Sequence, residues 1–163
     1  MNSPLANLAV ILCEPQQPGN IGAVARAMAN FGVTDLRLVR PCAHLHPEAR
    51  KFAAHGHLLL GQARLFADLD SALDGIDLSI AATCRSGRLR GELLDSTRLP
   101  ELVAALPAGA RTALVFGRED RGLATAEVAL CTRAVAIATL GPASSFNLAQ
   151  AVLVFLYELA RRP

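Results

Sequence analysis

Residues 8–26 read LAVILCEPQQPGNIGAVAR, and this stretch decides the fold. Its first six residues, Leu8–Cys13, are apolar at every position, which is typical of a strand in a parallel sheet that helices cover on both faces. After a turn that contains Pro18 and Gly19, apolar residues recur at helical spacing. The stretch therefore predicts a strand that runs through a turn into a helix, with Asn20 as a cap of that helix.

The rest of the chain repeats this alternation. Apolar runs predict further strands at 36–39, 64–66, 77–83, 112–116 and 134–138. Periodic segments, with Asp68 and Thr125 as two of the caps, predict helices at 47–55, 68–75, 99–106, 125–131 and 144–159. The polar segment 84–96 is expected to be a loop. We expect an α/β fold in one domain over residues 1–163, with a mainly parallel sheet and helices on both faces.

Composition narrows the class of protein. The chain has 163 residues, of which 52% are hydrophobic and 18% charged, and this suits a compact core rather than disorder. No apolar run reaches about 18 residues and no signal peptide precedes the first strand, so we expect a cytoplasmic protein without a membrane span. The four cysteines form no CxxC pair, so free thiols and no metal are expected. With a net charge of only +2, any surface for nucleic acid must be a local basic patch.

The last predicted helix is apolar around almost its whole circumference. A terminal helix with no polar face must bury more than one side. It either lies deep in its own domain or also contacts a second subunit, and the pattern leaves both open. The apolar positions are Phe146, Leu148, Ala149, Val152, Leu153, Phe155 and Leu156.

The turn after the first strand is the first of three segments that could carry chemistry. The start of a helix offers free N–H groups that suit a phosphate, and Arg26 lies about two turns further on. Arg26 could bind that phosphate or simply be a surface residue. A dinucleotide site is disfavoured, because the glycine pattern is Gly19-x-x-Gly22-x-x-Ala25 and the second strand ends without an acid.

The other two segments also follow predicted strands, where ligands bind in open parallel sheets. Residues 116–123, FGREDRGL, place glycines beside two acids and two bases. Glycine permits a close approach to a ligand, although the segment also reads as an ordinary charged turn. In residues 141–150, GPASSFNLAQ, Ser144 or Ser145 would cap the last helix, and Asn147 and Gln150 would be buried amides with internal partners.

Together the three segments resemble the SpoU/TrmH family of RNA 2′-O-methyltransferases, within the SPOUT superfamily. The stretches that carry the resemblance are NIGAVAR at 20–26, FGREDRGL at 116–123 and SFNLAQ at 145–150. They look closest to the branch that methylates the first nucleotide of the tRNA anticodon loop, nucleotide 32. The resemblance implies a Rossmann-like sheet with a deep trefoil knot in its carboxyl-terminal part, and a homodimer with the last helix at its interface.

The implied reaction moves a methyl group from S-adenosyl-L-methionine to a ribose 2′-hydroxyl of RNA, without a metal. The catalytic residues implied by the resemblance are Arg26, Asn20, Glu119, Ser145 and Asn147. The implied cofactor-binding residues are Thr83, Cys84, Arg85, Gly117, Ile137, Ser144, Ser145 and Phe146. Arg26 would orient the hydroxyl and an RNA phosphate, while Glu119 would bond to Arg26 or to the loop around it. Asn20 would hold the geometry of the site.

Two departures from the branch keep alternatives open. Ala143 stands where the branch commonly has a bulky aromatic residue, and the sequence ends at Arg162-Pro163 without the branch's helical extension. Ribosomal RNA therefore remains an alternative substrate, and a non-catalytic RNA-binding module remains an alternative class. Arg85, Arg88 and Arg90 either grip RNA phosphates or belong to a solvated loop.

Overall fold

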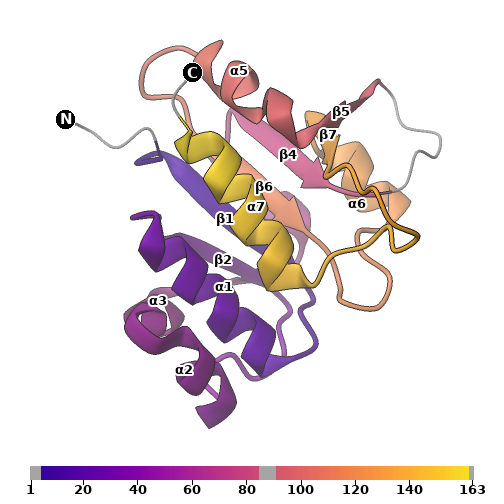
Figure 1. The fold of residues 1–163 in the computed structure, drawn as a ribbon. Helices are drawn as coiled ribbons and strands as arrows, with labels where there is room; N and C mark the ends of the chain where they lie inside the picture. The colour runs from indigo at the N-terminus through magenta and orange to yellow at the C-terminus, as the bar shows by residue number, and fades with distance from the viewer. Residues whose placement is uncertain (1–4, 85–90, 162–163) are drawn as a thin grey trace.

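The structure is a computed structural model that describes residues 5–84 and 91–161. Strands and helices alternate along the chain (Figure 1). The strands are β1 (Leu8–Cys13), β2 (Asp35–Val39), β3 (Arg64–Phe66), β4 (Leu78–Ala82), β5 (Leu93–Asp95), β6 (Thr112–Phe116) and β7 (Arg133–Ala136). The α-helices are α1 (Pro18–Asn30), α2 (Pro47–Ala53), α3 (His57–Gln62), α4 (Leu69–Ala72), α5 (Leu99–Ala104), α6 (Thr125–Leu130) and α7 (Leu148–Ala160). Short 3₁₀ helices occupy Ala54–Gly56 and Ser96–Arg98.

The strands form one seven-stranded sheet in the order β3-β2-β1-β6-β4-β7-β5, and every pairing between named strands is parallel. This confirms the predicted parallel α/β sheet. Strands β2 and β3 lie on one side of β1. The chain then crosses over, and β4 to β7 lie on the other side of β1. Such a reversal of strand order leaves a crevice at the carboxyl ends of the central strands.

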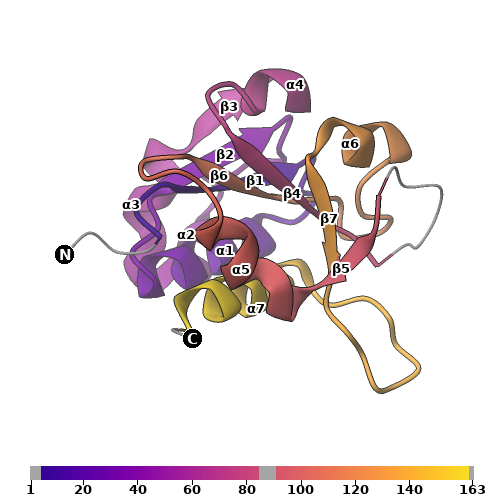
Figure 2. The same cartoon turned by 90° about the horizontal axis from the view of Figure 1, so that it is seen from above.

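Helices cover both faces of the sheet, as predicted (Figure 2). On one face α1, α5 and α7 pack over a core that includes Ile21, Leu114 and Phe155. On the other face α4 and α6 cover a smaller core that includes Ile11 and Val128. The central strands β1 and β6 are buried along their whole length, so each of their Val, Leu, Ile and Phe side chains contributes about 1.5–3 kcal/mol of transfer free energy. These two buried strands set the positions of the loops that follow them, residues 14–17 after β1 and 117–124 after β6.

Helix α1 lies unusually close to its neighbours. A Cβ atom added at Gly22 would lie 2.0 Å from the carbonyl oxygen of Ala49 in α2. At Gly56, between α2 and α3, an added Cβ would lie 2.5 Å from the carbonyl oxygen of Ala25. Gly22 therefore serves helix packing and not a dinucleotide, which agrees with the poor fit of its spacing to that fingerprint.

The structure corrects the predicted elements most at three places, and the helix predicted at 68–75 is also shorter, at Leu69–Ala72. The segment 84–96, expected to be a loop, contains the edge strand β5, whose three half-buried residues are too few to give a sequence signal. The predicted helix 47–55 ends earlier because Ala54 adopts a φ of 47°, and a separate helix, α3, follows. The last helix begins at Leu148 rather than near residue 144.

The predicted caps were right at one position and wrong at the others. The Asp68 side chain caps α4 by accepting the N–H of Ser71. Pro18 starts α1 early, so Asn20 lies inside the helix and its N-cap is Gln17. Thr125 is likewise the first residue of its helix and not the cap.

Candidate active site

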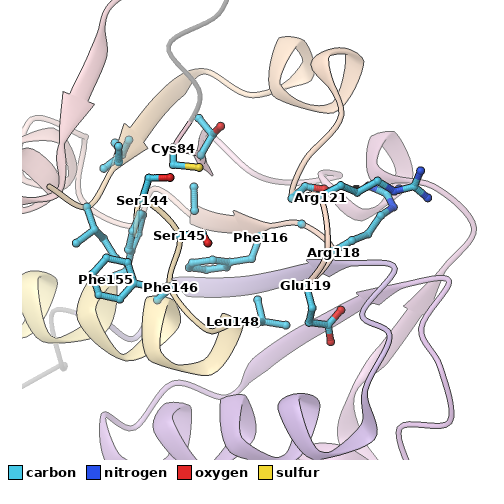
Figure 3. Close-up of a pocket in the computed structure, with 18 of the residues that line it drawn as sticks. Cys84, Phe116, Arg118, Glu119, Arg121, Ser144, Ser145, Phe146, Leu148 and Phe155 are labelled. Atoms are coloured by element: carbon cyan, nitrogen blue, oxygen red, sulfur yellow. Dashed lines mark hydrogen bonds between the residues drawn. The ribbon is translucent and has the colours of Figure 1, made fainter. Parts of the chain in front are cut away.

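A cavity of about 330 Å³ opens at the carboxyl ends of β4, β6 and β7 (Figure 3). Its walls combine aliphatic side chains and aromatic ones, such as Phe116 and Phe155, with polar groups from three loops. The rings of Phe116 and Phe155 meet edge to face, with centroids 5.2 Å apart, and so join the end of β6 to α7. An apolar cavity with a few polar groups at this place in a parallel sheet is typical of a ligand site.

The structure brings most of the predicted cofactor-binding residues to this cavity. The ones that line it are Thr83, Cys84, Gly117, Ile137, Ser144, Ser145 and Phe146. They come from the loops after β4, β6 and β7, the last of which leads into α7. Arg85, Arg88 and Arg90 lie outside the described residues.

The loop after β6 forms one wall of the cavity. Arg118 and Gly122 pair their backbones, with N–H to carbonyl oxygen distances of 3.2 Å and 2.8 Å. The two sides come so close that a Cβ atom added at Gly117 would lie 2.1 Å from the carbonyl carbon of Gly122. Only glycine fits at Gly117 without a shift of the loop, which agrees with the close approach expected from the sequence.

Glu119 connects this loop to the start of α1. Its carboxylate accepts the backbone N–H of Gln16 at 2.8 Å and 3.0 Å and that of Gln17 at 3.0 Å. It also accepts the side-chain amide of Asn20 at 3.3 Å. Glu119 was expected to bond either Arg26 or the loop around it, and in the structure it bonds the loop before α1.

Asn147 completes a chain of three side chains. Its amide nitrogen donates to Oδ1 of Asn20 at 3.1 Å, and its own Oδ1 accepts the N–H groups of Ala149 and Gln150 at 3.0 Å and 3.3 Å. Asn147 is thus the cap of α7, and the predicted cap at Ser144 or Ser145 was wrong. Asn147 and Gln150 are exposed, so the expectation of buried amides was also wrong. Ser145 lines the cavity beside this chain.

Arg26 lies on α1, and the structure does not bring it into the cavity wall. It is exposed, and within residues 5–84 and 91–161 its side chain forms no hydrogen bond or ion pair. Six residues of α-helix separate it from Asn20, a rise of about 9 Å. Its guanidinium is therefore available for an external anion, and Glu119 does not orient it.

Sequence analysis missed a charged cluster behind the cavity. Arg118 bonds Glu14, at the end of β1, and Glu127, in α6, with an Nη1 to Oε1 distance of 2.8 Å for the second pair. Arg40 also reaches Glu14, at 3.2 Å. Burial alone would raise the pKa of Glu127, but hydrogen bonds from Arg118 and from the N–H of Ala124 outweigh it and lower the pKa. The only signal for this cluster in the sequence is the pair of arginines in 116–123. Their partners depend on strand register, which the sequence does not give.

The cysteines are free. Burial raises the pKa of the Cys13 thiol to about 12 and that of Cys131 to about 11, so both are protonated at neutral pH. Cys84 is exposed at the cavity. In the described part of the chain no three His, Cys, Asp or Glu side chains gather to hold a metal ion, and no helix there could cross a membrane.

The model of the SpoU rRNA Methylase family matches residues 7–157, and the chain belongs to this family. This confirms the resemblance drawn from the three motifs. The chain is 39% identical over 155 residues to the tRNA (cytidine/uridine-2′-O-)-methyltransferase TrmJ of Salmonella typhimurium. The match covers 95% of this chain but 64% of that protein, so the chain spans somewhat less than two thirds of this relative.

Solved structures agree with this similarity. TrmJ from Z. mobilis ZM4 is 34% identical with a TM-score of 0.85, over 95% of this chain and 69% of that one. A probable methyltransferase from Bordetella pertussis Tohama I is 30% identical with a TM-score of 0.89, over 98% of both chains. The fold is therefore shared with a longer protein, of which this chain covers 69%, and with one that it covers almost completely.

Proposed function

We propose that this chain transfers a methyl group from S-adenosylmethionine to a ribose 2′-hydroxyl of tRNA, at nucleotide 32 of the anticodon loop. The observation that carries the proposal is the hydrogen-bonded chain Glu119–Asn20–Asn147, which joins all three family motifs beside one cavity. The similarity to proteins named as tRNA 2′-O-methyltransferases supports tRNA as the substrate. We also propose that residues 1–163 are one methyltransferase domain, acting in the cytoplasm.

The cavity fits the proposed cofactor. Its volume of about 330 Å³ is in the range for small-molecule sites, and its apolar walls suit an adenine ring. Backbone groups around Gly117 and Ile137 and the hydroxyls of Ser144 and Ser145 line the cavity and can serve polar recognition. S-adenosylmethionine would supply a methyl group already activated by its sulfonium, so the chain itself has to position the substrate and exclude water.

The roles proposed for Glu119, Asn20 and Asn147 rest on their contacts, whereas that of Arg26 rests on its exposed side chain. Glu119 already accepts hydrogen bonds from Gln16, Gln17 and Asn20, so it holds geometry rather than taking the hydroxyl proton. Asn20 and Asn147 fix the edge of the cavity, with Ser145 beside them. Arg26 is unpaired within the described ranges and suits a phosphate of the RNA. A charged arginine is a poor base, so it orients the hydroxyl and a phosphate, and the proton leaves towards that phosphate.

We further propose a homodimer through α7 and a trefoil knot in the carboxyl-terminal part of the chain. Leu153 and Tyr157 of α7 are 43% and 56% exposed although the helix is largely apolar. Exposed apolar side chains on one helix favour burial against a second copy. The knot rests on family membership, because the segment before α7 belongs to the part that is knotted in the family.

Transfer of tritiated methyl from S-adenosylmethionine tests the proposal directly, with unmodified tRNA and rRNA as parallel substrates. We expect transfer to tRNA, and loss of transfer in Arg26→Ala with unchanged thermal unfolding. Transfer to rRNA alone would correct the substrate. No transfer to either RNA by folded protein would reject the enzyme, and calorimetry would then show whether a non-catalytic module still binds the cofactor.

A further inference from the structure

Two neighbouring residues of the loop after β6 point in different directions (Figure 3). Glu119 points to the start of α1, where it accepts the N–H groups of Gln16 and Gln17. Arg118 points away from it, and its side chain is only 9% exposed. There Nη1 donates to Oε1 of Glu127 at 2.8 Å and to the carbonyl oxygen of Gly122 at 3.3 Å, and Nη2 donates to Glu14.

Glu14 is the first residue of the same turn that Glu119 holds. It follows β1 directly, its N–H donates to the carbonyl oxygen of Val39 at 2.8 Å, and it adopts a φ of 47°. A positive φ costs a non-glycine residue about 1–3 kcal/mol and persists only where its surroundings enforce it. Arg118 holds the Glu14 side chain together with Arg40, which bonds the other carboxylate oxygen at 3.2 Å, and Glu119 bonds the other end of the turn. Residues 14–17 are thus held at both ends by consecutive residues of one loop.

Arginine suits this place better than lysine. The guanidinium must bond two carboxylates that come from different elements, Glu14 after β1 and Glu127 in α6. A planar fork with five N–H donors does this in fixed directions, whereas an ammonium group acts as a point charge. Glu127 also accepts the N–H of Ala124 at 2.7 Å, so the bond from Arg118 extends to the start of α6.

We propose that Arg118 is a positioning residue for methyl transfer. It fixes the turn 14–17, and through that turn Asn20, relative to the cavity wall formed by its own loop. The inference rests on the proposed function, because it assigns to Arg118 the alignment of the cofactor cavity with the side of the site that receives the ribose. Loss of Arg118 then slows the transfer step more than it weakens cofactor binding.

The variants separate alignment from stability. Arg118→Met removes the guanidinium and takes from the half-buried Glu127 its cation, while Glu14 keeps Arg40, so the loss destabilises the fold. Arg118→Met combined with Glu127→Gln removes the Glu127 charge and restores stability. Arg118→Lys keeps the charge without the fork. Arg98→Met is the matched control, because Arg98 forms an exposed charged pair with Glu101 at 2.7 Å outside the site.

Three measurements are made on each variant: urea unfolding, amide hydrogen exchange of residues 14–20, and steady-state methyl transfer. We expect faster exchange at Gln16 and Gln17 in the three Arg118 variants and not in Arg98→Met. A displacement of about 1 Å costs roughly a hundredfold, so kcat should fall by about that factor in the double variant, while KM for S-adenosylmethionine changes by less than about threefold. Arg118→Lys should recover only part of kcat.

If the double variant regained both its stability and its kcat, the inference would be overturned. Unchanged amide exchange at Gln16 and Gln17 in all Arg118 variants would also overturn it. Failure of the proposed function looks different, because the unmodified protein itself would then transfer no methyl group. In that case the exchange data alone decide whether Arg118 fixes the turn.

Discussion

The side-chain amide of Asn147 donates a hydrogen bond to Oδ1 of Asn20 at 3.1 Å, although the two residues are 127 positions apart. Asn20 lies in the first turn of α1 and in turn donates to Glu119. Asn147 caps α7 with its other amide atom. The Asn147 side chain therefore has two separable roles. Its oxygen caps α7, and its nitrogen orients Asn20, which bonds the Glu119 carboxylate.

Substitution of Asn147 should separate these roles. Asn147→Ser keeps a capping oxygen and should change the free energy of unfolding by a few tenths of a kcal/mol, whereas Asn147→Ala should lower it by about 1 kcal/mol. Both variants lack the amide nitrogen that donates to Asn20, so both should lose methyl transfer to a similar extent. Urea unfolding and single-turnover transfer measure the two effects. A serine variant with full activity would exclude a role for the bond to Asn20.

Helix packing at Gly22 gives a second test. Gly22→Ala would place a Cβ atom 2.0 Å from the carbonyl oxygen of Ala49, so α1 and α2 must separate. The free energy of unfolding should fall by about 1–3 kcal/mol. Gly61→Ala is the control, because nothing lies within 4 Å of its added Cβ in α3. That variant should be unchanged or more stable by up to about 1 kcal/mol. Equal unfolding midpoints for the two variants would contradict the close packing.

Thiol reactivity provides a test of the cofactor cavity. At pH 8 a water-soluble thiol reagent should modify the exposed Cys84 first, because burial raises the pKa of Cys13 to about 12 and of Cys131 to about 11 and keeps both protonated. S-adenosylmethionine should slow this first phase, since Cys84 lines the cavity. The phase should vanish in Cys84→Ser. If saturating cofactor left its rate unchanged, the ligand would have to bind elsewhere.

The buried Cys13 also predicts how stability depends on pH. Its pKa is about 12 in the folded chain against 9.0 for an exposed thiol, so between these values the folded state holds a proton that the unfolded state has released. Stability should therefore fall as pH rises from about 9 to about 12, and remain unaffected by this group below pH 9. Cys13→Ala should flatten that part of the profile of unfolding free energy against pH. Parallel profiles for the two proteins would rule out this contribution.

The sequence predicts the parallel sheet and the position of the site because apolar runs mark the central strands and polar loops follow them. The segment around Gly117 could be assigned to the site because it follows a predicted strand, whereas Thr83 and Ile137 were assigned only through the family resemblance. Asn147 as the cap could not be chosen, because Ser144 and Ser145 are equally good capping residues. The bond from Arg118 to Glu14 was out of reach, since it depends on the register of β1 against β6.

The pairing of β1 with β6 also bears on how the chain folds. Leu8 lies beside Thr112 in the finished sheet, so β1 gains that neighbour only after the residues up to β6 have been synthesised. Contacts between such distant segments slow folding, because a long loop must close before they form. The three motifs consequently meet late, and the site stays incomplete until the chain has been synthesised as far as Asn147.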